Sequence, residues 1–311
     1  MKTINTIFIG TPEFALPALQ ALARDTDFSI KAVITQPDMP SGRHLAPTPP
    51  PVKELALKLK YQVWQPQKIV QVLDNLRAAE PDVIVVAAYA QIIPEEVLQL
   101  PKYGCINIHP SLLPKYRGAA PVQAAILNGD EQSGVTIMLL DKTLDTGPIL
   151  ARQTINIEAG ETTLALSAKL AELGAKMLDT TIKKYIKGQI KPLPQDSSQA
   201  SYVKMFEKKD GLIDWTRPAA AIERQIRALA HWPSAWTWLK GRQLKILEVD
   251  DAPLAINTYK PGKTFIYNKG LAVQCGTDAL LIKRLKLEGK NAVTGQAFIH
   301  GYKDILGSIL G

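Results

Sequence analysis

The run of valine, isoleucine and alanine within residues 82–88 constrains the fold more than any other feature of the sequence. A strand without a polar face has to be buried on both sides, as happens in a parallel sheet that is covered by helices. The start of the chain follows the same plan, with an apolar strand pattern at residues 4–9, a turn at Gly10 and a helical pattern at residues 14–23. These patterns predict an α/β domain with a Rossmann-like arrangement.

The first turn argues against a dinucleotide cofactor in this domain. Rossmann folds that bind dinucleotides carry the fingerprint G-x-G-x-x-G between the first strand and its helix. This chain has one glycine at that place, Gly10. The arrangement alone therefore does not define the function, which has to be argued from other residues.

Length and turn composition predict a second domain. A chain of 311 residues is long for a single hydrophobic core. Residues 188–204 are rich in glycine, proline and serine, which is typical of an exposed linker. Short strand patterns follow at residues 235–240, 244–249, 263–267, 271–275 and 279–287, a spacing that favours a small barrel of the oligonucleotide-binding (OB) type. We predict a catalytic domain at residues 1–187, a linker at 188–204 and an OB-like domain at 205–311.

Positive charge is concentrated in the predicted second domain. The whole chain has a formal net charge of +8, and residues 206–311 carry 16 Lys and Arg against 10 Asp and Glu, a net +6. A basic domain of this kind suits a polyanion such as RNA. A basic surface that only keeps the protein in solution explains the same numbers, and composition does not separate the two interpretations.

The cysteines and histidines predict a reducing compartment and no metal site. The two cysteines, Cys105 and Cys275, lie far apart in apolar strand patterns, as buried thiols do. The four histidines show no ligand spacing with cysteine or with one another. Neither a signal peptide nor a stretch of membrane-spanning length is evident, so we expect a cytoplasmic protein.

Most of the polar side chains that could take part in a reaction lie between residues 104 and 148. Asn107 and His109 alternate with apolar residues, so both should project from one face at the end of a strand, which Pro110 stops. Ligands bind at this end of the strands in open parallel sheets. A second strand pattern, at residues 134–140, leads into a turn-rich segment that contains Asp145.

These three residue types together suit acyl transfer. The imidazole of His109 can shuttle a proton, the amide of Asn107 can stabilise negative charge on oxygen, and the carboxylate of Asp145 can orient the imidazole. Each residue alone is more often architectural, either as a hydrogen-bonded histidine after a strand or as part of an Asp-Thr-Gly turn. Their joint occurrence favours a catalytic set without a nucleophile of its own.

An ordered series of motifs connects these residues. It comprises Asn-Ile-His at residues 107–109, Ser-Leu-Leu-Pro at 111–114, Lys-Tyr-Arg-Gly-Ala-Ala-Pro at 115–121 and Leu-Asp-Thr-Gly at 144–147. In this order and over nearly the full length, the chain closely resembles the folate-dependent formyltransferases, and most closely their tRNA-formylating branch. The resemblance implies transfer of a formyl group from 10-formyltetrahydrofolate to the amino group of methionyl initiator tRNA, whose own amine is the nucleophile.

The resemblance also implies roles for individual residues. Asn107 and His109 would stabilise the tetrahedral oxyanion, and Asp145 would orient His109 and assist proton movement. The folate would be bound by Ser111, Leu112, Leu113 and Pro114, with residues 88–91 forming a further wall of the pteridine pocket. Arg43, in a proline-rich loop, would meet the tRNA acceptor stem, and Lys204 would lie near its aminoacyl end. Residues 44–46 and 207–209 depart from the family pattern beside these two cations.

Two other functions remain open from the sequence. A formyltransferase that acts on an amino-sugar nucleotide can share the two-domain plan. A non-catalytic RNA-binding module would bind tRNA without folate and would not depend on His109. A monomer is the default expectation, because the two domains already supply a complete site.

Overall fold

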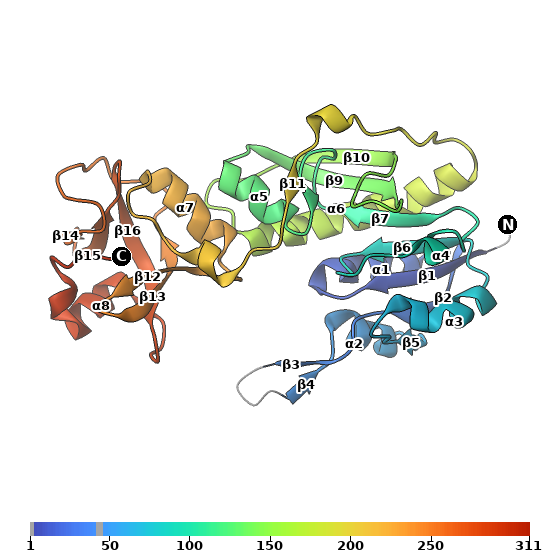
Figure 1. Cartoon of the computed structure of the whole chain (residues 1–311), viewed down its shortest axis with the longest axis horizontal. Helices are drawn as coiled ribbons and strands as arrows, with labels where there is room; N and C mark the ends of the chain where they lie inside the picture. The colour runs from blue at the N-terminus through green and yellow to red at the C-terminus, as the bar shows by residue number, and fades with distance from the viewer. Residues whose placement is uncertain (1–2, 42–45) are drawn as a thin grey trace. The chain divides into compact units, whose positions relative to one another are not determined.

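The computed structural model describes residues 3–41 and 46–311, which form two compact units (Figure 1). The first unit comprises Met1–Pro121, Ser133–Ile155 and Ser167–Val203, and the second comprises Val122–Gln132, Asn156–Leu166 and Lys204–Gly311. Arg43, which was predicted to bind tRNA, lies outside the described residues. None of the helices in the described ranges is long and apolar enough to cross a membrane.

The first unit is built on a seven-stranded sheet with the order β10-β9-β7-β6-β1-β2-β5. Its strands are β1 (Ile4–Gly10), β2 (Phe28–Ile34), β5 (Val63–Trp64), β6 (Val83–Ala87), β7 (Cys105–His109), β9 (Gln132–Leu139) and β10 (Ile149–Asn156). The pairs β1–β2, β1–β6, β2–β5 and β6–β7 are parallel, whereas β7 and β9 are antiparallel. The sheet is thus a parallel Rossmann-like core with an antiparallel addition beside β7, and this confirms the predicted α/β class.

Strand β6 has the environment that its composition predicted. All of its residues are buried, and it lies between β1 and β7 in the middle of the sheet (Figure 1). The turn after β1 needs glycine for a reason of packing, not of cofactor binding. A Cβ atom at Gly10 would lie 2.8 Å from the carbonyl oxygen of Ala87 and 2.8 Å from Cβ of Ala15. The chain therefore begins its first helical segment in close contact with the end of β6.

Helices connect and cover these strands. They are α1 (Leu16–Arg24), α2 (Pro51–Lys58), α3 (Leu73–Ala78), α4 (Glu95–Leu98) and α6 (Thr163–Ile186), with 3-10 turns at Glu13–Ala15, Ile69–Val72 and Ser197–Gln199. The proline-rich segment before α2 was predicted to be a loop. It forms a separate two-stranded antiparallel sheet from β3 (Met39–Ser41) and β4 (Ala46–Thr48). A further small parallel sheet pairs β8 (Arg117–Gly118) with β11 (Tyr202–Val203).

The second unit contains an antiparallel sheet with the order β12-β13-β16-β15-β14, to which β17 adds beside β16. Its strands are β12 (Ala235–Leu239), β13 (Arg242–Val249), β14 (Thr264–Tyr267), β15 (Gly270–Gln274), β16 (Ala279–Leu287) and β17 (Val293–Thr294). The helices are α5 (Pro121–Asn128), α7 (Ala219–Ala228) and α8 (Gly295–Gly301), with 3-10 turns at Lys208–Gly211 and Lys303–Ile305. Each strand predicted here is present, and the unit is consistent with a small barrel-like domain.

Candidate active site

The end of β7 holds two polar side chains on one face of the sheet. Helix α6 approaches the other face so closely that a Cβ at Gly174 would lie 2.6 Å from Cγ2 of Ile108. Because side chains alternate along a strand, Asn107 and His109 point away from α6. Both are buried, with exposed fractions of 8% and 4%. The predicted pairing of these two residues on one strand face is therefore confirmed.

The loop after β7 is held by hydrogen bonds from neighbouring strands. The hydroxyl of Thr136 on β9 donates to the carbonyl oxygen of Ser111 (2.7 Å) and accepts from the peptide N–H of Leu113 (3.1 Å). Arg152 on β10 donates to the carbonyl oxygen of Leu113 (2.7 Å). The Ser111 hydroxyl itself donates to the carbonyl oxygen of Lys115 (2.6 Å). The residues predicted to bind folate, Ser111, Leu112, Leu113 and Pro114, thus form a rigid segment whose backbone is already fixed.

His109 has two different neighbours at its two ring nitrogens. Nε2 lies 3.0 Å from the carbonyl oxygen of Tyr116, and because a carbonyl only accepts, Nε2 carries a proton. Nδ1 lies 3.7 Å from Oδ2 of Asp145, a separation that is too long for a direct hydrogen bond but within the range of an ion pair if the ring is protonated. A proton taken up at Nδ1 would therefore lie between the ring and the carboxylate.

Asp145 is placed by an unusual backbone conformation. Its φ is +54°, in the left-handed region that aspartate tolerates better than most residues. Its Oδ2 accepts from the peptide N–H of Gly118 at 2.8 Å. The turn passes so close to β9 that a Cβ at Gly147 would lie 1.9 Å from the carbonyl oxygen of Leu139. This turn brings the predicted carboxylate to His109, although the two residues are 36 positions apart in the sequence.

The side-chain amide of Asn107 is available to a ligand. Asn107 is buried, with an exposed fraction of only 8%. Even so, within residues 3–41 and 46–311 no protein group forms a hydrogen bond with its side-chain amide. Its two N–H groups can donate to an oxygen on which negative charge develops. The arrangement at the end of β7 therefore combines an unused donor with a histidine and carboxylate that can take up a proton.

The loop after β6, which was predicted to line the folate pocket, has an unusual backbone conformation. Ala88 and Ala90 both have positive φ, +48° and +62°, and the side chain of Gln36 donates to the carbonyl oxygen of Tyr89 at 2.9 Å. Tyr89 is buried in the apolar core, and this burial raises the pKa of its hydroxyl to about 12. The tyrosine is therefore a neutral packing residue.

Two functional groups were not anticipated from the sequence. The carbonyl oxygen of Tyr116 sets the protonated nitrogen of His109, and Tyr116 has a φ of +61° that no glycine or asparagine signals. Gln195 donates to the carbonyl oxygens of Asp145 (2.8 Å) and Gly147 (2.7 Å) from a segment that its composition assigned to a linker. The remaining predicted residue, Lys204, is exposed and is the first residue of the last segment of the second unit.

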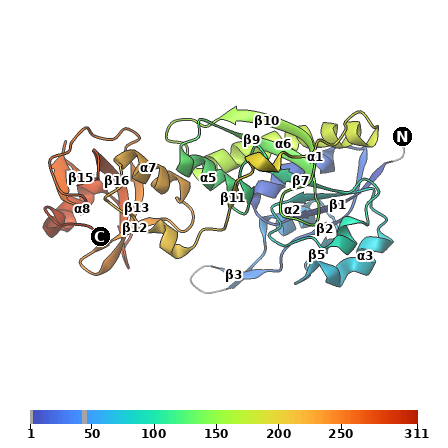
Figure 2. The same ribbon diagram turned by 45° about the horizontal axis from the view of Figure 1, so that its top comes forward.

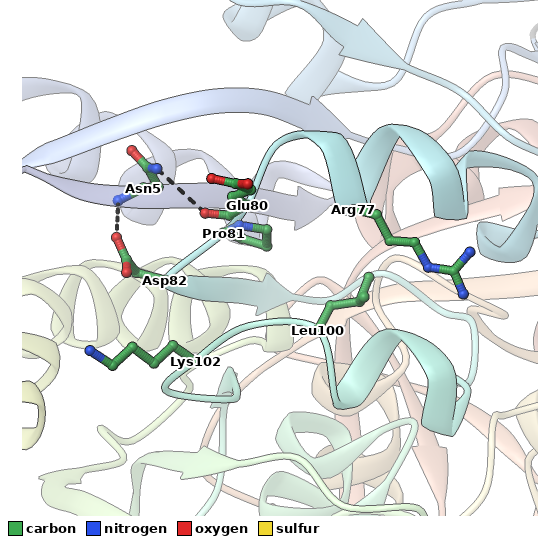
Figure 3. Close-up of a pocket in the computed structure, with 7 residues that line it drawn as sticks. All are labelled: Asn5, Arg77, Glu80, Pro81, Asp82, Leu100 and Lys102. Carbon is green, nitrogen blue, oxygen red and sulfur yellow. Dashed lines mark hydrogen bonds between the residues drawn. The ribbon is translucent and has the colours of Figure 1, made fainter.

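A separate cavity of about 380 Å³ lies elsewhere in the first unit (Figure 3). Asn5, Asp82 and Lys102 are among its lining residues, and the peptide N–H of Asn5 donates to Oδ2 of Asp82 at 2.8 Å. These residues stand at or near the amino ends of β1, β6 and β7, whereas His109 is the last residue of β7. The cavity therefore lies at the opposite ends of these parallel strands from His109. In the described part of the chain, no three His, Cys, Asp or Glu side chains gather in a way that could hold a metal ion.

Comparison with known proteins agrees across both units. Residues 1–182 match the family model described as formyl transferase, and residues 205–303 match the model described as formyl transferase, C-terminal domain. Methionyl-tRNA formyltransferase of Caldicellulosiruptor saccharolyticus is 43% identical to this chain over 312 residues, which cover 99% of this chain and 100% of the relative. Methionyl-tRNA formyltransferase of Geobacter sulfurreducens is 40% identical and covers 100% of this chain.

Solved structures share the fold at lower identity. An N-formyltransferase from Helicobacter canadensis, in complex with folinic acid and dTDP-3-aminofucose, superposes with a TM-score of 0.68 at 17% identity and covers 90% of this chain and 99% of that one. HypX from Aquifex aeolicus, in complex with tetrahydrofolic acid, gives a TM-score of 0.64 at 17% identity over 97% of this chain. The chain spans about half the length of HypX, 47%. Since relatives at 40% identity or more extend over the full length and the family models match both units, the chain belongs to the methionyl-tRNA formyltransferases within the formyl transferase family.

Proposed function

We propose that this protein transfers the formyl group of 10-formyltetrahydrofolate to the free amino group of methionyl initiator tRNA. The observation that carries the proposal is the buried pair formed by Nδ1 of His109 and Oδ2 of Asp145, 3.7 Å apart, on the strand that also presents the unused amide of Asn107. This set contains a proton acceptor and an oxyanion donor and lacks a serine or cysteine nucleophile. Such a set suits a reaction in which the acceptor's own amine attacks.

The residues divide the work of the reaction as follows. The methionyl amine forms a bond to the formyl carbon, the bond from that carbon to N10 of the folate breaks, and N10 takes up a proton. Asn107 donates a hydrogen bond to the formyl oxygen as it becomes negative. His109 accepts the proton that the attacking amine loses, at the nitrogen that faces Asp145, and the carboxylate stabilises the resulting cation. The proton then passes to N10, and the site returns to its starting state.

The folate fits the rigid segment after β7. We assign Ser111, Leu112, Leu113 and Pro114 to its binding, because their backbone is fixed by β9 and β10 before any ligand arrives. Folate supplies an activated formyl carbon whose leaving group is an amine. Arg43 and Lys204 are assigned to tRNA, in keeping with the net +6 charge of residues 206–311. We further propose catalytic, linker and OB-like domains at 1–187, 188–204 and 205–311, in a cytoplasmic monomer.

The decisive experiment is transfer of labelled formyl from 10-formyltetrahydrofolate to methionyl initiator tRNA. We expect label in the tRNA with the wild-type protein and a loss of about 10² to 10³ in turnover for His109→Ala. His300→Ala is the matched control, because His300 lies in the second unit, remote in sequence from every assigned site residue. A His109→Ala protein with full activity would contradict the mechanism.

One other acceptor has an observation in its favour. The Helicobacter canadensis structure, which holds dTDP-3-aminofucose, shares the fold of this chain over 90% of its length. A dTDP-amino sugar therefore belongs in the same assay as a competing acceptor. Label in the sugar and none in the tRNA would keep the catalytic set and replace the substrate. Binding of tRNA with no label in any acceptor would instead indicate a non-catalytic RNA-binding module.

A further inference from the structure

Arg117 is a buried cation that is held by neutral groups. Its side chain is among the largest that are fully buried, with an exposed fraction of 1%. Its guanidinium donates to Oε1 of Gln195 from Nε (3.1 Å) and from one terminal nitrogen (2.9 Å), and to the hydroxyl of Tyr202 (2.9 Å). Among the residues that the structure describes, no carboxylate forms an ion pair with it. Burying an arginine costs free energy unless its N–H groups form hydrogen bonds. The bonds to Gln195 and Tyr202 meet this need and hold the guanidinium in one orientation.

Gln195 transmits the position of Arg117 to the catalytic turn. Its Oε1 accepts the two hydrogen bonds from Arg117, and its Nε2 donates to the carbonyl oxygens of Asp145 (2.8 Å) and Gly147 (2.7 Å). A guanidinium only donates and carbonyls only accept, so the orientation of the amide is unambiguous. Both N–H donors and both lone pairs of the amide are in use. The glutamine thus fixes the turn on both sides of Thr146.

The same chain segment also fixes the carboxylate end of Asp145. We call residues 195–203 the strap; it returns along the first unit after α6 and ends in β11 (Figures 1 and 2). The peptide N–H of Arg117 donates to the carbonyl oxygen of Ser201 (2.8 Å), and that of Ala119 donates to Val203 (2.9 Å). Between these two bonds, the N–H of Gly118 donates to Oδ2 of Asp145 (2.8 Å). The strap therefore restrains the backbone and the side chain of one residue.

We propose that Gln195 is a positioning residue for formyl transfer: oriented by Arg117, it holds the turn 145–147 so that the carboxylate of Asp145 stays beside His109. The inference rests on the proposed function, because it gives Asp145 a role in proton transfer. Asp145 has a φ of +54°, a conformation that its own preferences do not maintain, so an external restraint is needed. Three hydrogen bonds supply this restraint. Two run from Gln195 to the carbonyl oxygens of Asp145 and Gly147, and the third runs from the N–H of Gly118, beside the strap, to Oδ2 of Asp145.

The first test compares Gln195→Ala with Gln199→Ala. Gln199 lies on the same strap, is exposed and donates to Oδ2 of Asp196 (3.0 Å), so its loss leaves the turn untouched. We expect kcat for Gln195→Ala to fall about 10- to 100-fold, with KM for both substrates changed less than about threefold, because a displaced Asp145 carboxylate affects the chemical step more than binding. Gln199→Ala should match the wild type. Equal activity of the two variants would overturn the proposal.

Gln195→Glu separates positioning from stability. The carboxylate still accepts from Arg117 and gives it a counter-ion, but it has no N–H to donate to Asp145 and Gly147. The new ion pair offsets part of the stability that the two lost hydrogen bonds supplied, so we expect the thermal midpoint to lie above that of Gln195→Ala while kcat falls as far. If kcat instead rises with the thermal midpoint toward the wild-type value, Gln195 is only structural.

A double-mutant cycle tests whether the effect passes through Asp145. In an Asp145→Asn background, Gln195→Ala should lower kcat by less than about threefold, because the group that it positions is already absent. A loss as large as in the wild-type background would overturn the proposal.

Amide hydrogen exchange makes the result independent of the substrate. Peptides that contain residues 143–148 should exchange faster in Gln195→Ala and Gln195→Glu than in the wild type and Gln199→Ala. Faster exchange in a protein without formyl transfer would reject the proposed function and retain the restraint. Unchanged exchange would reject the positioning role whatever the enzyme formylates.

Discussion

Oδ2 of Asp145 lies 3.7 Å from Nδ1 of His109, whereas the other ring nitrogen is occupied by the carbonyl oxygen of Tyr116 at 3.0 Å. Nε2 therefore makes a structural hydrogen bond, and we assign Nδ1 to proton transfer. The carboxylate does not select the tautomer by direct contact, since the carbonyl already places the proton on Nε2. In the mechanism proposed above, its role is to stabilise a proton that arrives at Nδ1.

Asp145→Asn should lower kcat for formyl transfer by about 10² to 10⁴, because a neutral amide cannot stabilise the cation that forms when His109 takes up a proton. Asparagine tolerates the left-handed conformation and has the same size, so we expect the thermal midpoint to shift by less than about 4 °C, or about 1 kcal/mol. The measurements are kcat in the labelled-formyl assay and thermal unfolding by circular dichroism. The exposed Asp74→Asn serves as control, and a fully active Asp145→Asn would exclude the carboxylate from the reaction.

Both cysteines should be unreactive toward thiol reagents in the folded protein. Burial raises the pKa of Cys105 and of Cys275 to about 12, so at pH 8 about one molecule in 10⁴ carries a thiolate at either site. We expect no reaction with Ellman's reagent at pH 8 in buffer and two reactive thiols per chain in 6 M guanidinium. Rapid reaction of one thiol in the native protein would show that its site opens.

The same shifts predict how stability depends on pH. The folded state holds these two protons up to about pH 12, whereas the unfolded chain releases them near its ordinary thiol pKa. The contribution of the thiols is thus complete below about pH 8.5 and is lost as pH rises toward 12, by about 1.4 kcal/mol per pH unit for each group. Urea unfolding at pH 8, 9 and 10 should show this fall. Cys105→Ala and Cys275→Ala together should remove most of it.

The turn that carries Asp145 should not tolerate a methyl group at Gly147. A Cβ there would lie 1.9 Å from the carbonyl oxygen of Leu139, which is backbone and cannot rotate away. Gly147→Ala should therefore lower the free energy of unfolding by about 2 kcal/mol or more and reduce kcat as well. Gly301→Ala is the control, because nothing lies within 4 Å of its Cβ and its φ is ordinary. Equal urea midpoints for the two variants would contradict this account.

The sequence predicted the architecture well wherever burial dominates. The apolar run at residues 82–88 became β6 in the middle of the sheet, and the five strand patterns of the second unit all formed. Periodicity also placed Asn107 and His109 together, because one short strand determines their relative position. The approach of Asp145 to His109 was expected from the residue types and from the resemblance and not from periodicity, since it depends on a turn whose geometry no periodicity encodes.

The supporting groups could not be predicted for a physical reason. The carbonyl oxygen of Tyr116 acts through the backbone, and every residue type offers the same carbonyl. Gln195 lies in a stretch that is rich in proline and serine, and its amide makes long-range contacts to Arg117 and Asp145 that composition does not reveal. Sequence patterns report burial and local conformation, whereas these two contacts of Gln195 join segments 50 or more residues apart.

Asn107→Asp provides the sharpest test of the oxyanion role. The two side chains have the same shape, but aspartate replaces the N–H donors by a negative charge beside the oxygen on which charge develops. We expect kcat to fall by about 10² to 10³ for Asn107→Ala and by at least as much for Asn107→Asp, although aspartate fills the space better. Single-turnover rates and folate binding measured by fluorescence separate the chemical step from binding. If Asn107→Asp is more active than Asn107→Ala, volume and not hydrogen bonding is what this position supplies.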